Sequence, residues 1–114
     1  MNDSPLLIKS KQFALKIIKN CDILYKQQKE FVLSNQLLRS GTSIGANIRE
    51  AFYAQSKADF ISKLSIALKE CAESEYWLEL LNESNRFFDS QLLKDCIELK
   101  KLLMSSINTT KQGM

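Results

Sequence analysis

Apolar residues recur at helical spacing through almost the whole chain, and this periodicity constrains the fold more than any other feature of the sequence. Side chains spaced three or four residues apart line one face of a helix, which is then buried against another element. Four such stripes occur: Leu6, Phe13, Ile17, Cys21 and Leu24; Leu37, Gly41, Ile44, Ile48 and Ala51; Phe60, Leu64, Ala67, Cys71, Ser74, Leu78 and Leu81; and Leu92, Cys96, Leu99 and Leu103. The first stripe is widened by Ala14, Ile18 and Tyr25. The pattern predicts an all-α fold.

Start and stop signals place the four helices at about 4–28, 34–55, 57–84 and 89–108. Ser4 before Pro5 is a strong helix start, and Ser56 to Asp59 resembles a capping box with Asp in place of Glu. Candidate N-caps of the second and fourth helices are Ser34 or Asn35 and Asp89 or Ser90, and the polar residues after Asn108 are expected to fray. Seven-residue spacing along the third helix favours bundle packing. We predict a single domain, residues 1–114, folded as an antiparallel up-down-up-down four-helix bundle.

Composition narrows the class of protein. The 114 residues include one proline, three glycines and no histidine, and the net charge is +3. No apolar run reaches the ~18 residues of a membrane span, and Met1 to Pro5 reads as a cytosolic N-terminus with no signal peptide. Cys21, Cys71 and Cys96 lie on apolar stripes without a C-x-x-C pair, so we expect buried, reduced thiols in a cytoplasmic protein.

The sequence lacks the residue combinations of common catalytic sites, which argues against an enzyme. Without histidine there is no Ser-His-Asp triad and no Glu-x-x-His di-iron motif. The segment Gly41 to Gly45 lacks the lysine of a phosphate loop, and its G-x-x-x-G spacing indicates close helix approach. Glu50, Glu70, Glu73 and Glu75 are expected to form either a solvated acidic face or ion pairs with Arg39 and Arg49, within one chain or between subunits. A carboxylate metal site is the alternative. We predict no catalytic, cofactor-binding or metal-binding residues and no cofactor.

The segment Leu37–Tyr53 forms helix poorly by itself. Its serines, glycines, Thr42 and Asn47 weaken the helix by about 3–5 kcal/mol relative to alanine, so neighbours must hold it. Its outward residues are Arg39, Thr42, Ser43, Ala46, Arg49, Glu50 and Tyr53. The middle of this set is small, whereas solvated helices usually carry long side chains there. We therefore predict that these residues form an oligomer interface; the alternative is a small, exposed face.

The first helix carries a basic face. At 100° per residue, Lys9, Lys16, Lys19 and Lys26 fall within about a third of its circumference. Such a face is suited to the phosphates of RNA or DNA, and Ile8, Leu15 and Ile23 outside the core stripe suggest an apolar patch for another subunit. The alternative is a solvated lysine face with isolated aliphatic residues.

Helices two and three also carry the motifs of a known family. They read Gln36-Leu37-Leu38-Arg39-Ser40, then Ser43-Ile44-Gly45-Ala46-Asn47-Ile48-Arg49-Glu50, Ser56-Lys57-Ala58-Asp59-Phe60, Leu64-Ser65-Ile66-Ala67-Leu68-Lys69-Glu70 and Glu73-Ser74-Glu75-Tyr76-Trp77-Leu78-Glu79-Leu80-Leu81. The sequence resembles the bacterial four-helix-bundle family called the 23S rRNA-intervening sequence or S23 family. The sequence departs from many members of this family at two places. It has Ala51 where they have glycine, and it lacks the proline that they have near the position of Val32.

The resemblance implies a ring-like homopentamer. A related branch, the accessory variability proteins of retroelements, binds nucleic acid and a reverse transcriptase through basic surfaces, and most members have no assigned activity. The expected function is a non-catalytic oligomer that binds RNA or other nucleic acid as an accessory factor. The alternative is a protein–protein interaction scaffold without a nucleic-acid role, in which the acidic third helix complements the basic first helix of a neighbour. The expected partners are further copies of the chain, RNA or DNA, or a partner protein, and no membrane.

Overall fold

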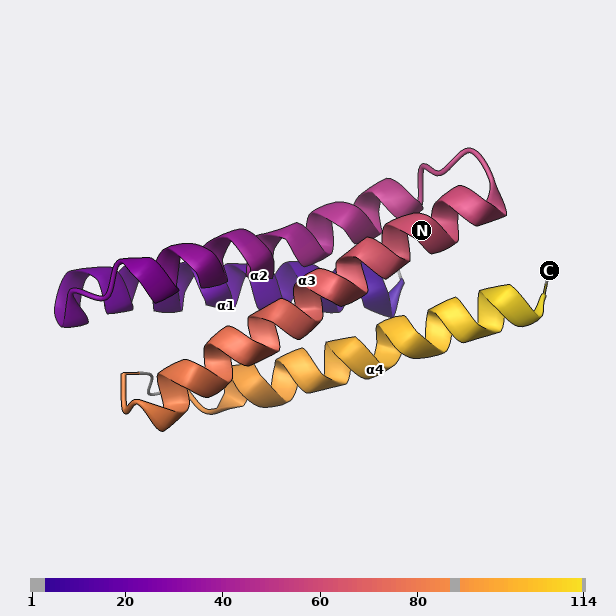
Figure 1. Ribbon diagram of the computed structural model, residues 1–114. Helices are drawn as coiled ribbons and strands as arrows, with labels where there is room; N and C mark the ends of the chain where they lie inside the picture. The colour runs from indigo at the N-terminus through magenta and orange to yellow at the C-terminus, as the bar shows by residue number, and fades with distance from the viewer. Residues whose placement is uncertain (1–3, 87–88, 114) are drawn as a thin grey trace.

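The computed structural model describes residues 4–86 and 89–113, and these form four helices. They are α1 (Pro5–Gln28), α2 (Val32–Ala51), α3 (Lys57–Glu83) and α4 (Gln91–Gln112). The described residues include no strand, so the all-α prediction with four helices is confirmed. Figure 1 shows successive helices joined at alternating ends of an elongated molecule measuring 47 × 22 × 21 Å.

The four helices pack around one core, with α2 against α1 and α3, and α4 against α3 and α1. The predicted α2 stripe from Leu37 to Ala51 is buried throughout, and so is the α4 stripe. The predicted widening of the α1 stripe is wrong at two positions, because Ile18 and Tyr25 are 50% and 51% exposed. These two side chains lie on the outer edge of the seam between α1 and α2, where they line a surface hollow.

Helix α2 begins at Val32, two residues before the predicted start. The carboxylate of Glu30 accepts a hydrogen bond from the backbone N–H of Leu33 at 2.9 Å, which satisfies a free donor of the first turn. Ser34 is therefore not the N-cap; its hydroxyl is bonded to the Glu30 carbonyl and its side chain is buried. The connection between α1 and α2 is correspondingly shorter than predicted, and Lys29 closes α1 with a left-handed φ of 56°.

Helix α2 ends at Ala51 instead of reaching position 55. The backbone N–H groups of Tyr53 and Ala54 turn back to the carbonyls of Glu50 and Ala51, each at 3.0 Å, which tightens the chain out of the α-helix. The rings of Phe52 and Phe60 meet edge to face at 5.8 Å across this turn. The chain then reaches the predicted cap of α3, where the Ser56 hydroxyl accepts from the backbone N–H of Asp59.

Helix α4 continues to Gln112, so the prediction of a frayed tail after residue 108 is wrong. Ile107 is only 6% exposed and holds the last turns on the core. The ammonium group of Lys57 donates to the carbonyl oxygen of Gly113 at 2.8 Å. At the other end of α4, the N-cap is Ser90, whose side chain makes no capping bond, and the carboxylate of Asp89 before it accepts from the backbone N–H of Gln91. Phe87 and Phe88 of the predicted turn before it lie outside the described residues.

Candidate functional site

The seam between α1 and α2 is hollowed along its length on the outer surface. One hollow is lined by Leu7, Ile8, Lys11, Gln12, Leu15, Arg49 and Tyr53. A second shares Leu7, Lys11 and Arg49 with it and continues over Ser10, Ala14, Thr42, Gly45 and Ala46. A third lies between Ile18, Lys19, Tyr25, Asn35 and Leu38 toward the far end of the seam. We refer to these three hollows together as the α1–α2 groove.

The groove is bordered by large apolar side chains that the described residues leave exposed. Leu15 is 58% exposed and Tyr53 is 73% exposed. Most of the exposed large hydrophobic residues of the described chain belong to α1, α2 and the turns beside them: Ile8, Leu15, Ile18, Tyr25, Phe31, Val32, Leu38 and Tyr53. Six of these eight line the groove, and exposed apolar residues gathered in this way mark an interaction site more often than single exposed residues do.

The floor of the groove is shallow because small residues let α1 and α2 approach closely. A β-carbon at Gly41 would lie 3.0 Å from two side-chain carbons of Ile17, so any larger residue there meets the core. At Gly45 the nearest atom would be the Ser10 hydroxyl oxygen at 3.4 Å, an ordinary contact. Gly41 is buried, as predicted, and Gly45 is half-buried. Close packing of the two helices therefore depends on position 41.

The seven residues predicted as an oligomer interface divide between two surfaces. Thr42, Ala46, Arg49 and Tyr53 line the α1–α2 groove. Arg39 and Glu50 instead reach α3, where Glu50 pairs with Lys63 at 3.4 Å. The Ser43 hydroxyl donates to the carbonyl of Arg39 within α2. Sequence periodicity placed all seven on one outward face of α2. That face is wide, so one edge of it borders α1 and the other edge borders α3.

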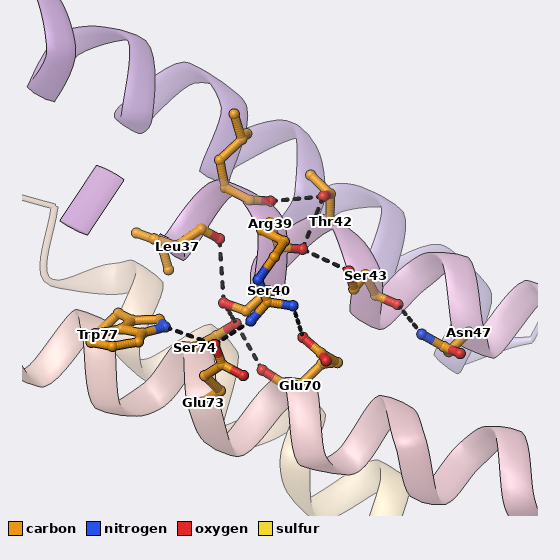
Figure 2. Close-up of polar contacts among 11 residues, drawn as sticks. Leu37, Arg39, Ser40, Thr42, Ser43, Asn47, Glu70, Glu73, Ser74 and Trp77 are labelled. Atoms are coloured by element: carbon orange, nitrogen blue, oxygen red, sulfur yellow. Dashed lines mark hydrogen bonds and ion pairs between the residues drawn. The ribbon is translucent and has the colours of Figure 1, made fainter. Parts of the chain in front are cut away.

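Arg39 links α2 to α3 through two carboxylates (Figure 2). Its guanidinium contacts Glu70 at 3.1 Å and also pairs with Glu73, which accepts a further bond from the Trp77 indole N–H at 3.2 Å. The hydrogen bond from Arg39 lowers the pKa of Glu73 below its usual value. Beside this cluster, the hydroxyls of Ser40 and Ser74 meet at 2.8 Å in the buried interface. These polar contacts hold α2 on α3.

The predicted nucleic-acid-binding lysines do not share one open face. Lys16 pairs with Asp95 at 2.9 Å, and Lys9 pairs with Glu98, so both point toward α4. The hydrogen bond to Asp95 raises the pKa of Lys16. Lys26 pairs with Asp22 one turn earlier at 3.2 Å. Of the four predicted residues, only Lys19 makes no ion pair with the described residues, and it lies in the α1–α2 groove.

Several cations make no ion pair with a described residue, and some of these lie away from the groove, namely Lys29, Lys57, Lys69, Lys94, Lys101 and Lys111. Within residues 4–86 and 89–113, Lys11, Lys19 and Arg49 make no ion pair, and all three line the α1–α2 groove. The predicted pairing of Arg49 with the acidic residues is therefore absent there. Among the carboxylates of the same part of the chain, only Glu79 and Glu83 neither form an ion pair nor cap a helix, and both are exposed on α3.

The three thiols are buried and unpaired, as the sequence predicted. Cys71 and Cys96 lie across the α3–α4 interface with their sulfur atoms 3.8 Å apart. The hydrogen bond between the Cys96 and Cys71 thiols, together with burial, raises the pKa of Cys96 strongly. Burial alone raises the pKa of Cys21 to about 12. Because the thiolate is the reactive form, these cysteines are packed as inert core residues.

The fold and this surface define the class of protein: a small four-helix bundle whose most distinctive feature is an uncovered groove between its first two helices. In the part of the chain described, no three His, Cys, Asp or Glu residues come together as a metal site, and no helix is long and apolar enough to cross a membrane. The chain belongs to the family of 23S rRNA-intervening sequence proteins, whose sequence profile matches residues 3–105.

A solved structure supports the same assignment. The chain is 54% identical to a protein of unknown function from the S23 ribosomal protein family of Bacteroides thetaiotaomicron. The match covers 90% of this chain and 97% of that one, with a TM-score of 0.87. No match was found among curated proteins. Neither family description names an enzymatic activity.

Sequence reasoning missed part of the apolar border of the groove. It identified Ile8 and Leu15 as surplus apolar residues on α1 but assigned Ile18 and Tyr25 to the core. The sequence did contain a signal for these exposed residues. Apolar residues cover a wider part of the circumference of α1 than its contacts with α2 and α4 can bury. Leu38, which belongs to neither the predicted core stripe nor the predicted outward residues of α2, is 37% exposed at the groove.

Proposed function

We propose that this protein is a non-catalytic scaffold that assembles with copies of itself through the α1–α2 groove. The observation that supports this most is the concentration of exposed apolar side chains along the groove, from Tyr53 at one end to Tyr25 at the other. Interfaces that persist in solution bury such residues at their centre and leave charged residues at the rim. Lys11, Lys19 and Arg49 occupy the rim of this groove.

The small residues of α2 fit the same proposal. Thr42 and Ala46 leave the middle of the groove shallow, so a helix from another subunit can lie close to the α2 backbone. A long side chain at Ala46 would fill this space. The family resemblance adds the expectation that the assembly is a homopentamer. A cytoplasmic location belongs to the proposal as well, and three unpaired thiols are compatible with it.

Sedimentation velocity over a range of protein concentrations tests this proposal. The wild-type protein is expected to sediment as an oligomer, and Ile18→Lys is expected to shift it toward the monomer. Met104→Lys is the matched control, because Met104 is exposed to a similar extent, 47% against 50%, but lies on α4. A wild-type protein that stays monomeric at all concentrations, or an Ile18→Lys variant that assembles as the control does, contradicts the proposal.

Nucleic-acid binding is a second candidate function, and the cations of the groove favour it. Lys11, Lys19 and Arg49 are not neutralised by ion pairs with described residues, and exposed pairs such as Lys16 with Asp95 are weak enough for phosphates to compete. Such contacts would position RNA or DNA without reading its sequence. In an oligomer the net charge of +3 is repeated by every subunit, which strengthens the attraction.

Binding to RNA and DNA measured against salt concentration tests this candidate. The expected result is binding that weakens steeply as salt increases. The charge reversals Lys9→Glu, Lys16→Glu and Lys19→Glu together separate the two functions: loss of binding by an intact oligomer favours nucleic acid, and loss of assembly favours the scaffold. Lys9→Glu and Lys16→Glu also break ion pairs with α4, and Lys19 lies in the groove itself, so the mass of each variant is measured beside its binding. No binding at low salt contradicts the candidate.

A further inference from the structure

The outer surface of α3 carries a short acidic strip whose charges have no partner in the described chain. Tyr76, Glu79 and Glu83 are spaced three and four residues apart, which places them on one side of the helix. Tyr76 is 56% exposed, and both glutamates are exposed. The remaining glutamates of α3 are used internally, since Glu70 and Glu73 bind Arg39 and Glu75 binds Lys100. We refer to Tyr76, Glu79 and Glu83 as the α3 strip.

The α1–α2 groove has the opposite charge. Lys11 and Arg49 line the same two hollows, and Lys19 lies in the third. The acidic residue of the groove, Asp22, pairs with Lys26 and offers little charge to oppose them. Two grooves facing each other across a two-fold axis would therefore bring like charges together, and like charges in an interface oppose association.

We infer that the α1–α2 groove of one subunit receives the α3 strip of a second copy, in a head-to-tail contact. This inference rests on the proposed self-assembly and specifies its interface. Glu79 and Glu83 then meet the cations at the groove rim, and the Tyr76 ring adds apolar area beside residues such as Leu15. The charges of both surfaces, unmatched within one chain, are matched between two chains.

The head-to-tail arrangement has a consequence for symmetry. The groove and the strip lie on different helices, so each subunit offers one of each and can contact two neighbours. Contacts of this type generate closed rings when the rotation between neighbours closes, and filaments when it does not. A contact of groove with groove would stop at a dimer. The charge pattern thus accounts for assembly beyond two copies.

Charge reversal tests the inference directly. The pair Lys11→Glu with Arg49→Glu reverses the groove, and the pair Glu79→Lys with Glu83→Lys reverses the strip. Each pair alone places like charges across the contact and is expected to raise the dissociation constant on the order of a hundredfold. The variant with all four changes restores opposite charges between the strip and positions 11 and 49, and it is expected to assemble again although Lys19 keeps its charge. Sedimentation velocity gives the mass, and circular dichroism verifies that each variant keeps its helices.

The control is Lys94→Glu with Lys101→Glu, which changes the net charge as the groove pair does but on exposed positions of α4. It is expected to assemble like the wild type. If the strip pair assembles normally while the groove pair does not, the head-to-tail contact is wrong and self-assembly through the groove stands. A four-change variant that stays monomeric also overturns the inference. A monomeric wild type refutes the proposed function itself, which keeps the two failures distinct.

Discussion

Gly41 packs so closely on Ile17 that a β-carbon at position 41 would lie 3.0 Å from both Cγ atoms of the isoleucine side chain. Ile17 is fully buried and branched, so it has no room to move aside. This contact is where α2 crosses α1, and it explains a glycine in the middle of a helix despite its poor helix propensity. The α1–α2 groove exists because the two backbones approach each other here.

The two glycines of α2 are predicted to respond in opposite directions to alanine. Gly41→Ala should destabilise the bundle by about 1–3 kcal/mol through overpacking against Ile17. Gly45→Ala meets only ordinary contacts at 3.4 Å and should be neutral or stabilising by up to ~1 kcal/mol through helix propensity. Gly41→Leu should unfold the protein. Urea unfolding measures all three, and equal effects of the two alanine changes would contradict the packing argument.

The hydrogen bond between Ser40 and Ser74 is predicted to stabilise the α2–α3 interface. Ser74→Ala should lower the free energy of unfolding by about 1 kcal/mol, because the Ser40 hydroxyl loses its partner across the interface at 2.8 Å. Ser40 retains a long bond to the Leu37 carbonyl, which limits the loss. In a double-mutant cycle, Ser40→Ala should cost less when Ser74 is already alanine. Strictly additive effects would show that the two hydroxyls do not interact.

Acid is predicted to weaken the Arg39–Glu73 link. The hydrogen bond from Arg39 lowers the pKa of Glu73 from its ordinary value of 4.5, so the stabilisation is complete above that pH and is lost as the pH falls through the lowered pKa. Glu73→Gln should therefore be less stable than the wild type at pH 7, by at most ~1 kcal/mol for a pair this exposed. At pH 2 the two proteins should converge.

The control for this pH experiment is Glu73→Gln made in an Arg39→Gln background, because the ion pair is already absent there. Urea unfolding at pH 7 and pH 2 provides the comparison. A stability difference between wild type and Glu73→Gln that is as large at pH 2 as at pH 7 would show that the ion pair is not its source.

The cysteines are predicted to be unreactive in the folded protein. Burial raises the pKa of Cys21 to about 12, so almost no thiolate exists at pH 8, and Cys71 and Cys96 are fully buried. A thiol reagent should modify the native protein slowly and all three cysteines rapidly in denaturant. Fast modification of Cys21 under native conditions would mean that the seam between α1 and α2 opens readily.

The sequence predicted the helices and the core well because apolar periodicity reports burial directly. Leu37, Ile44 and Ile48 are all fully buried, and Ser56 caps α3 as expected. Helix ends were less certain, because they depend on contacts distant in sequence. Lys57 holds the end of α4 through Gly113, and no local pattern around position 113 indicates this contact.

The candidate site was predictable only in part. The outward positions of Thr42 and Ala46 were predicted from the sequence, and both residues line the groove. That these small residues form an oligomer interface stays a prediction. The positions of Lys9 and Lys16 were not predictable, because their ion pairs depend on how α4 packs beside α1. The helical periodicity of α1 places the four lysines on one face. Which of them form ion pairs depends on the acidic residues that α4 brings beside that face.

The most direct test of self-assembly through the α1–α2 groove is the mass of Ala46→Arg in solution. Ala46 is exposed on the groove floor, so arginine there leaves the fold intact but fills the space that a neighbouring subunit requires. Ala58→Arg, at an exposed position in the first turn of α3, is the matched control. By sedimentation velocity, Ala46→Arg should be a folded monomer while the wild type and Ala58→Arg are oligomers. An Ala46→Arg variant that assembles like the wild type would contradict the account.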